Sequence, residues 1–324
     1  MSLSSRVRLF LPLLLIAVLF VPNASAQSER IGLVTDVVGS VELAKAGSDT
    51  FSKADWGTPL FEGDRVRTAA SSEAVVLFSN SNMLTIRAGN TFTVSASSVS
   101  SPALSGPVKA VDGELMAAAS DLTLHRAGQG EIEVLGGLRS GGASADIEIS
   151  FPRNSKITSA RPQFSWTSAG DFEEYKVTVR TANGAVWSGS TSDMEMMYPA
   201  DAPALVAGET YFWQVDGEDM LDVASSPLVS FEVLSDANLA KIEAGKAQIT
   251  ALFDGASLSS GQLYMIGSMY VKQGLIADAI TTFKQISESN PQAAMPHEIL
   301  GKLYYEIGLK DEAVRALQTA IALK

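Results

Sequence analysis

Residues 260–293 read SGQLYMIGSMYVKQGLIADAITTFKQISESNPQA, and residues 294–324 read AMPHEILGKLYYEIGLKDEAVRALQTAIALK. The second stretch repeats the first at an offset of 34 residues. The matching pairs are Gly267 with Gly301, Tyr270 with Tyr304, Ala279 with Ala313, and Phe283 with Leu317. Apolar residues recur every three or four positions in both stretches, which indicates helices. The fixed offset predicts two copies of one helical hairpin.

This pattern resembles the tetratricopeptide repeat, in which a small residue lies where two antiparallel helices cross and a proline closes the unit. Gly267, Ala279 and Pro291 stand at such positions in the first copy. The resemblance implies that the first helices of the hairpins share an inner face that binds extended peptides. On this sequence that face would comprise Tyr264, Ser268, Lys272, Glu298, Lys302 and Tyr305. The alternative is that these six residues are ordinary solvated positions.

Two repeats are fewer than the three or so that form an independent solenoid. Residues 236–253 carry Ile242, Ile249 and Leu252 on one stripe, so we expect a helix there that completes a degenerate preceding repeat. No polar capping helix follows the second hairpin. We therefore expect that end to pack on another surface, which could be another domain, a second copy or a client protein.

Residues 27–135 consist of short alternating runs such as Val66/Thr68 and Leu84/Ile86 between turn residues, which predicts an all-β domain. The string Gly57-x-x-Leu60-x-x-Gly63-Asp64-x-Val66-x-Thr68 resembles the FecR-type domain of bacterial envelope proteins. That resemblance implies periplasmic sensing or docking. The cytoplasmic anti-sigma segment of such regulators is missing here, so we do not expect sigma-factor binding. Gly63-Asp64 predicts a tight turn in which the carboxylate bonds nearby backbone.

The Gly-rich residues 136–145 predict a flexible linker. Residues 146–235 then place large apolar groups on one face of several short strands, as in Phe164/Trp166 and Tyr211/Trp213. This stretch resembles a fibronectin type III or immunoglobulin-like sandwich, which implies that the Tyr211 hydroxyl bonds back to the preceding loop. Trp187 and Trp213 are predicted to be core residues, with a carbohydrate-stacking platform as the alternative.

Residues 1–26 have the three parts of a secretory signal peptide: Arg6 and Arg8, an apolar run over 9–21, and Ala24-Ser25-Ala26. The run is shorter than the roughly 18 to 20 residues that span a bilayer, so cleavage before Gln27 is favoured over a retained anchor. We expect no membrane segment in the mature chain. The expected location is the periplasm of a Gram-negative bacterium, or its cell surface or medium.

The chain has no cysteine and two histidines, which excludes thiolate chemistry and leaves little imidazole for catalysis. We therefore expect no catalytic residues, no cofactor, no metal site and no enzymatic activity. Without the leader, 22 basic residues stand against 36 acidic ones, which disfavours a nucleic-acid partner. The acidic residues at 216–222 predict a solvated loop, and calcium binding there stays open.

The expected fold is a multidomain β + α chain: an all-β FecR-like domain, a β-sandwich, and α-helical hairpin repeats within residues 236–324. The expected function is that of an exported, non-enzymatic adaptor that binds a protein partner in the cell envelope. The alternative is a protein that binds cell-wall glycan or surface polysaccharide through its β domains, with repeats that form a homodimer.

Overall fold

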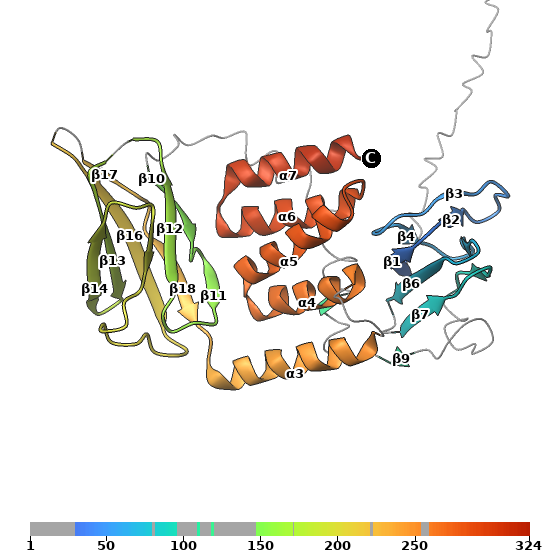
Figure 1. Cartoon of the computed structure of the whole chain (residues 1–324), viewed down its shortest axis with the longest axis horizontal. Coiled ribbons are helices and arrows are strands. Elements are labelled where there is room, and N and C mark those ends of the chain that lie inside the picture. Colours follow the sequence, from blue (N-terminus) through green and yellow to red (C-terminus); the bar gives the residue numbers. More distant parts are fainter. Residues whose placement is uncertain are drawn as a thin grey trace, which may run out of the picture.

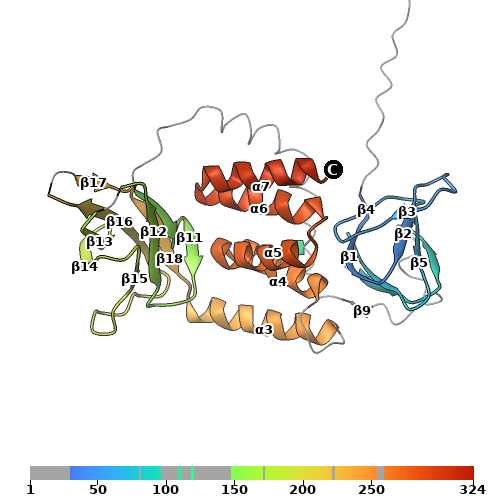
Figure 2. The same ribbon diagram turned by 45° about the horizontal axis from the view of Figure 1, so that its top comes forward.

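The computed structural model describes residues 30–79, 82–95, 109–110, 118–119, 147–170, 172–220, 223–253 and 259–324. A group of helices lies between two β domains (Figure 1), and the turned view shows the same order (Figure 2). The mixed β + α architecture agrees with the prediction from the sequence. The predicted leader at 1–26 and the predicted linker at 136–145 lie outside the described residues.

The N-terminal β domain consists of two antiparallel sheets that share a core. One sheet has the order β4-β1-β6-β7-β9, with bounds Pro59–Leu60, Gly32–Val38, Glu73–Phe78, Asn82–Ile86 and Lys109–Ala110. The other has the order β3-β2-β5-β8, with bounds Ser52–Lys53, Val41–Ala44, Arg65–Thr68 and Thr91–Thr93. Alternate residues such as Val34, Val66 and Val76 are buried between the sheets. The period of two seen in the sequence reflects this burial.

The turn before β5 has the structural role that the sequence predicted. The carboxylate of Asp64, which is 1% exposed, accepts hydrogen bonds from the backbone N–H groups of Phe61 and Ala46, both at 3.1 Å. Lys45 Nζ lies 3.1 Å from the same carboxylate. Gly63 has a φ of +81°, which a side chain would strain. Asp64 therefore fixes two loops.

The second β domain is a sandwich. One sheet has the order β10-β12-β15, with bounds Ile147–Phe151, Gln163–Ser168 and Glu195–Met197. The other has the order β11-β18-β16-β13-β14, with bounds Ser155–Ile157, Val229–Val233, Thr210–Glu218, Glu174–Thr181 and Gly184–Thr191. Strand β17 (Val223–Ser225) pairs with β16. Aromatic rings from both sheets, including Phe164, Trp213 and Phe231, meet in the core.

The aromatic residues of the sandwich are placed largely as predicted. The backbone N–H of Val206 donates to the Tyr211 hydroxyl at 2.8 Å, which confirms the expected bond to the preceding loop. Trp213 is fully buried, and its Nε1 donates to the carbonyl of Pro152 at 2.7 Å. Trp187 is half-buried and stacks on Phe164. Packing therefore accounts for both tryptophans.

Five helices follow the sandwich: α3 (Asp236–Leu252), α4 (Ser260–Gln273), α5 (Ile276–Ser289), α6 (Ala294–Ile307) and α7 (Lys310–Ala322). Helices α6 and α7 begin 34 residues after α4 and α5, so the repeat in the sequence is a repeat of structure. Gly274 and Gly308 end α4 and α6 in the left-handed conformation. Helix α3 packs against α4 with Ile242 and Ile249 buried.

The helices share one hydrophobic core with the outer face of the N-terminal β domain. Leu33 of β1, Val75 and Leu77 of β6, and Met83 of β7 are all buried in the same cluster as the helical residues. Strand β6 is thus buried on both faces, because Ala74 and Val76 point into the core of the domain. The N-terminal β domain is therefore packed onto the helices rather than tethered to them.

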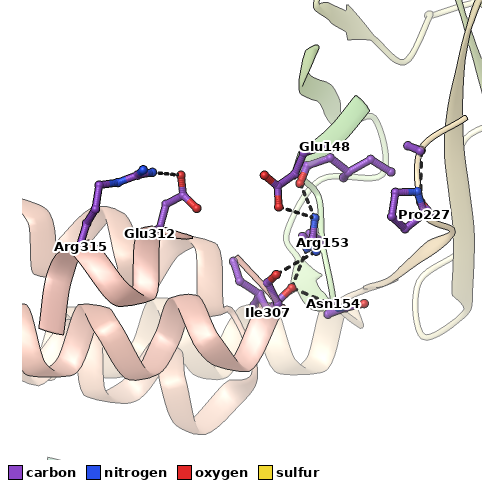
Figure 3. A network of polar contacts seen from close by, with 10 residues as sticks. Glu148, Arg153, Asn154, Pro227, Ile307, Glu312 and Arg315 are labelled. Carbon is purple, nitrogen blue, oxygen red and sulfur yellow. Dashed lines mark hydrogen bonds and ion pairs between the residues drawn. The ribbon is translucent and has the colours of Figure 1, made fainter. Parts of the chain in front are cut away.

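The sandwich is joined to the opposite side of the helices by the segment between β10 and β11. The Arg153 guanidinium donates from Nε to the carbonyl of Ile307 at 2.7 Å and from Nη2 to that of Gly308 at 3.0 Å (Figure 3). Ser155 Oγ accepts the N–H of Ile276, at the start of α5, at 3.0 Å. Helix ends leave such groups without partners inside the helix. The sandwich thus supplies caps to both hairpin turns.

Candidate protein-binding site

The six predicted inner-face residues divide into a buried group and a more accessible group. Tyr264, Ser268 and Glu298 are buried, with exposed fractions of 0%, 1% and 8%. Lys272 is exposed, Lys302 is half-buried, and Tyr305 is 41% exposed. The expectation that all six form one open surface is therefore wrong for the first three residues.

Tyr264 is buried because the N-terminal β domain covers it. The indole of Trp56 packs edge-on against its ring with centroids 5.8 Å apart. The Tyr264 hydroxyl donates to the carbonyl of Ala119 at 2.7 Å. The ring of Phe283 lies on the helical side at 6.2 Å. In this arrangement Tyr264 holds two parts of the same chain together and does not contact a partner.

Ser268 and Glu298 are also used within the chain. The Ser268 hydroxyl donates to the Tyr264 carbonyl one turn earlier, at 2.7 Å. The Glu298 carboxylate lies 2.9 Å from Nζ of Lys324, so it forms an ion pair with the end of the second hairpin. Both side chains therefore have structural roles that the spacing of the repeat alone did not reveal.

Lys272, Lys302 and Tyr305 are the more accessible residues of the predicted face. Lys272 follows Ser268 by four residues on α4, and Lys302 follows Glu298 by four on α6, so each lies one turn further along the same helix face. Tyr305 lies on the next turn of α6. We call these three residues the open inner face; their role in binding stays a prediction.

Removing the Tyr264 hydroxyl tests the internal role of this residue. We expect Tyr264→Phe to lower the free energy of unfolding by about 1 kcal/mol, because it removes a buried hydrogen bond to Ala119. Tyr305→Phe is the matched control, and we expect a change below about 0.5 kcal/mol because that side chain is 41% exposed. Urea unfolding of both variants measures the difference. Equal stabilities would contradict the internal role.

The histidine and acidic residues noted in the sequence have ordinary surroundings where the structure describes them. His297 is half-buried, and burial lowers its pKa. Asp216 accepts a hydrogen bond from Ser225 Oγ at 2.6 Å across the β16–β17 pair, and Asp222 lies outside the described residues. Within the part of the chain that the structure describes, no three His, Asp or Glu side chains are arranged to hold a metal ion.

Comparison with known proteins supports the first hairpin directly. Residues 263–293 match the tetratricopeptide repeat family. The first hairpin is thus similar to a tetratricopeptide repeat in both sequence and helix arrangement. Repeats of this kind generally form surfaces that bind other proteins. No curated protein matches the chain.

Among the described helices, none combines the length and the apolar character needed to cross a membrane.

Two solved structures show limited similarity. Fibronectin(III)-like modules of Clostridium thermocellum CbhA align over 27% of this chain and 94% of their own, at 15% identity and a TM-score of 0.21. A beta-1,2-glucanase from Parabacteroides distasonis aligns over 91% of this chain and 59% of its own, at 10% identity and a TM-score of 0.22. At these scores neither similarity bears on function.

Proposed function

We propose that this protein is an exported, non-enzymatic adaptor of the bacterial cell envelope that binds a protein partner next to its tetratricopeptide hairpins. The observation that carries the proposal is the hairpin pair itself, whose first unit matches the repeat family at residues 263–293. The open inner face offers two cationic side chains and the exposed ring of Tyr305. A ring with few rotatable bonds beside a positive charge suits an acidic peptide segment with apolar residues.

Export is supported by the sequence of residues 1–26, which has the parts of a secretory leader in the right order. The resemblance of the N-terminal β domain to the FecR type points to the same compartment. The proposed location is the periplasm of a Gram-negative bacterium, with the cell surface as the other destination of an exported chain. In this proposal the two β domains hold the hairpins in place and add to the contact with the partner.

Site-specific crosslinking in intact cells tests the proposal. A photoreactive residue in place of Tyr305 should trap one discrete envelope protein, and the same residue in place of Gln318, an exposed position on α7, should not. Adding Lys302→Ala should weaken the Tyr305 crosslink, since it removes one charge next to that position. In the crosslinked complex, the adaptor itself should be found in the periplasmic fraction, with Gln27 as its first residue.

Three results would count against this function. A Tyr305 crosslink to cell-wall glycan would favour attachment to the wall. A crosslink only to a second copy would favour a dimer. An intact Met1–Ala26 segment on a membrane-bound chain would overturn the proposed soluble location.

A further inference from the structure

A cleft lies between the sandwich and the helices, beside the Arg153 contacts. Its volume is about 490 Å³, within the usual range for sites that hold small organic ligands. One wall comes from β10 and β12, and the other from α5, α6 and the start of α7. No residue predicted from the sequence to bind a partner lines it.

The walls of the cleft combine apolar surface with acidic side chains. Phe151, Ile280 and Leu309 contribute apolar surface. Glu148, Asp278 and Glu312 contribute carboxylates. Lys284 is the one basic residue among the described lining residues, and its ammonium lies 5.7 Å from the centroid of the Tyr304 ring. The lining is therefore net negative.

The carboxylates come from separate domains and meet at the cleft. Those of Glu148 on β10 and Glu312 on α7 point toward one another (Figure 3). Burial raises the pKa of Glu148; Arg153 opposes this, and the charges of Glu312 and Asp311 add to it. Burial also raises the pKa of Asp278, at the start of α5. The folded chain thus holds carboxylates in a partly dehydrated space where a further positive charge would be stabilised.

Glu148 and Glu312 each form an ion pair with one arginine, but these pairs do not use all of their carboxylate oxygens. Arg153 Nη1 lies 3.7 Å from Glu148 and also serves the carbonyl of Ile149. Arg315 pairs with Glu312 from the next turn of α7, at 2.5 Å. One oxygen of Glu312 is buried without a hydrogen-bond partner among the described residues. Glu312 therefore keeps unused acceptor capacity beside the cleft.

The chemistry of the lining selects an organic cation over a metal ion. The carboxylates of the described residues are not grouped closely enough to coordinate a metal. Phe151, Ile280 and Leu309 instead offer contact to an apolar stem. A cation with several hydrogen-bond donors on such a stem would satisfy the acids and cover the apolar wall together.

We propose that this cleft binds a primary ammonium group on an aliphatic stem, the chemistry that free diamines and lysine side chains share. The ammonium group lies between Glu148 and Glu312, and the stem lies along Phe151 and Leu309. Because the two acids belong to different domains, the bound cation joins the sandwich to the helices. This site is separate from the open inner face and does not depend on the adaptor function.

Calorimetric titration of the full chain at neutral pH and low salt tests the site. We expect 1,5-diaminopentane to bind and 1,5-pentanediol, which has the same stem without the charges, not to bind. Nα-acetyl-lysine N-methylamide forms the second arm. Binding of the diamine alone assigns the site to free amines, and binding of the lysine derivative alone assigns it to a peptide. Failure of both amines to bind would overturn the proposal.

Substitutions of residues that line the cleft test where the amine binds. Glu148→Gln and Glu312→Gln should each weaken binding about tenfold, because each removes one charge-assisted hydrogen bond. Glu288→Gln, at an exposed position on α5 outside the cleft, is the matched control and should bind as the parent does. Lys284→Gln should strengthen binding several-fold by removing a like charge, a gain that misfolding cannot mimic. Unchanged affinity in both glutamate variants would overturn the site.

Discussion

Gly301→Leu should lower the free energy of unfolding of the helical region by about 3 kcal/mol, near the upper end for overpacking in a well-packed core. A Cβ atom at Gly301 would lie 2.5 Å from Cγ of Leu317 and 3.3 Å from the backbone oxygen of Ala313. The larger side chain therefore fits only if α6 and α7 separate. Urea unfolding followed by far-ultraviolet circular dichroism measures the loss.

Lys302→Ala is the control for this experiment, since it changes the adjacent residue on α6, which is more exposed than Gly301. We expect its stability to stay within about 0.5 kcal/mol of the parent. The Tyr305 crosslink should be lost in Gly301→Leu, because the open inner face depends on the position of α6. A Gly301→Leu chain as stable as the parent would mean that the helices do not cross where the repeat places them.

The repeat could be predicted from the sequence because its cause is local. Close helix packing requires a small residue at a fixed place in each hairpin, so Gly267 and Gly301 recur 34 residues apart. A Cβ atom at position 267 would lie 2.8 Å from Phe283, another position that recurs at the same offset. The Tyr211 contact was expected from the resemblance to a fibronectin type III or immunoglobulin-like sandwich, and its partner Val206 is five residues away.

The burial of Tyr264 could not be predicted in this way. It depends on Trp56 and Ala119, which approach α4 only after the N-terminal β domain has docked. One signal of that docking was present in the sequence. Residues 74–78 are Ala-Val-Val-Leu-Phe, a continuous apolar run, and such runs are typical of strands that are buried on both faces. The second face of β6 covers the helices.

The acidic cleft is still harder to predict from sequence. Glu148 and Glu312 are far apart in the chain and belong to elements with different periodicity. Each looks like an ordinary surface charge in its own element. Their meeting depends on the angle at which the sandwich is joined to the hairpin turns, which Arg153 and Ser155 determine through helix-end groups. The geometry of the cleft is thus a property of the domain contact.

Arg153→Ala should uncouple the sandwich from the helices at a cost of about 3 kcal/mol. The substitution removes the guanidinium bonds to Ile307 and Gly308 and the third bond, to Ile149 at 2.8 Å. A typical hydrogen bond contributes about 1 kcal/mol net, so three amount to about 3 kcal/mol, and the helix-end carbonyls of α6 carry partial negative charge. Asn154 would remain as a single donor, to the Ile307 carbonyl at 3.2 Å.

Two spectroscopic signals report on the unfolding of the sandwich and of the helices separately. Trp166, Trp187 and Trp213 lie in the sandwich, so tryptophan fluorescence reports mainly on that domain, whereas far-ultraviolet circular dichroism reports mainly on the helices. In Arg153→Ala the two signals should change at different urea concentrations, and the two midpoints should lie further apart than in the parent.

Arg153→Lys should recover only part of the coupling, because an ammonium group cannot reproduce the planar fork that reaches two carbonyls. Arg180→Ala, at an exposed position on β13, removes the same side chain from the same domain and should leave the parent behaviour unchanged. If Arg153→Ala and Arg180→Ala behave alike, the sandwich is held to the hairpin turns by its apolar contacts and the Ser155 cap rather than by the guanidinium.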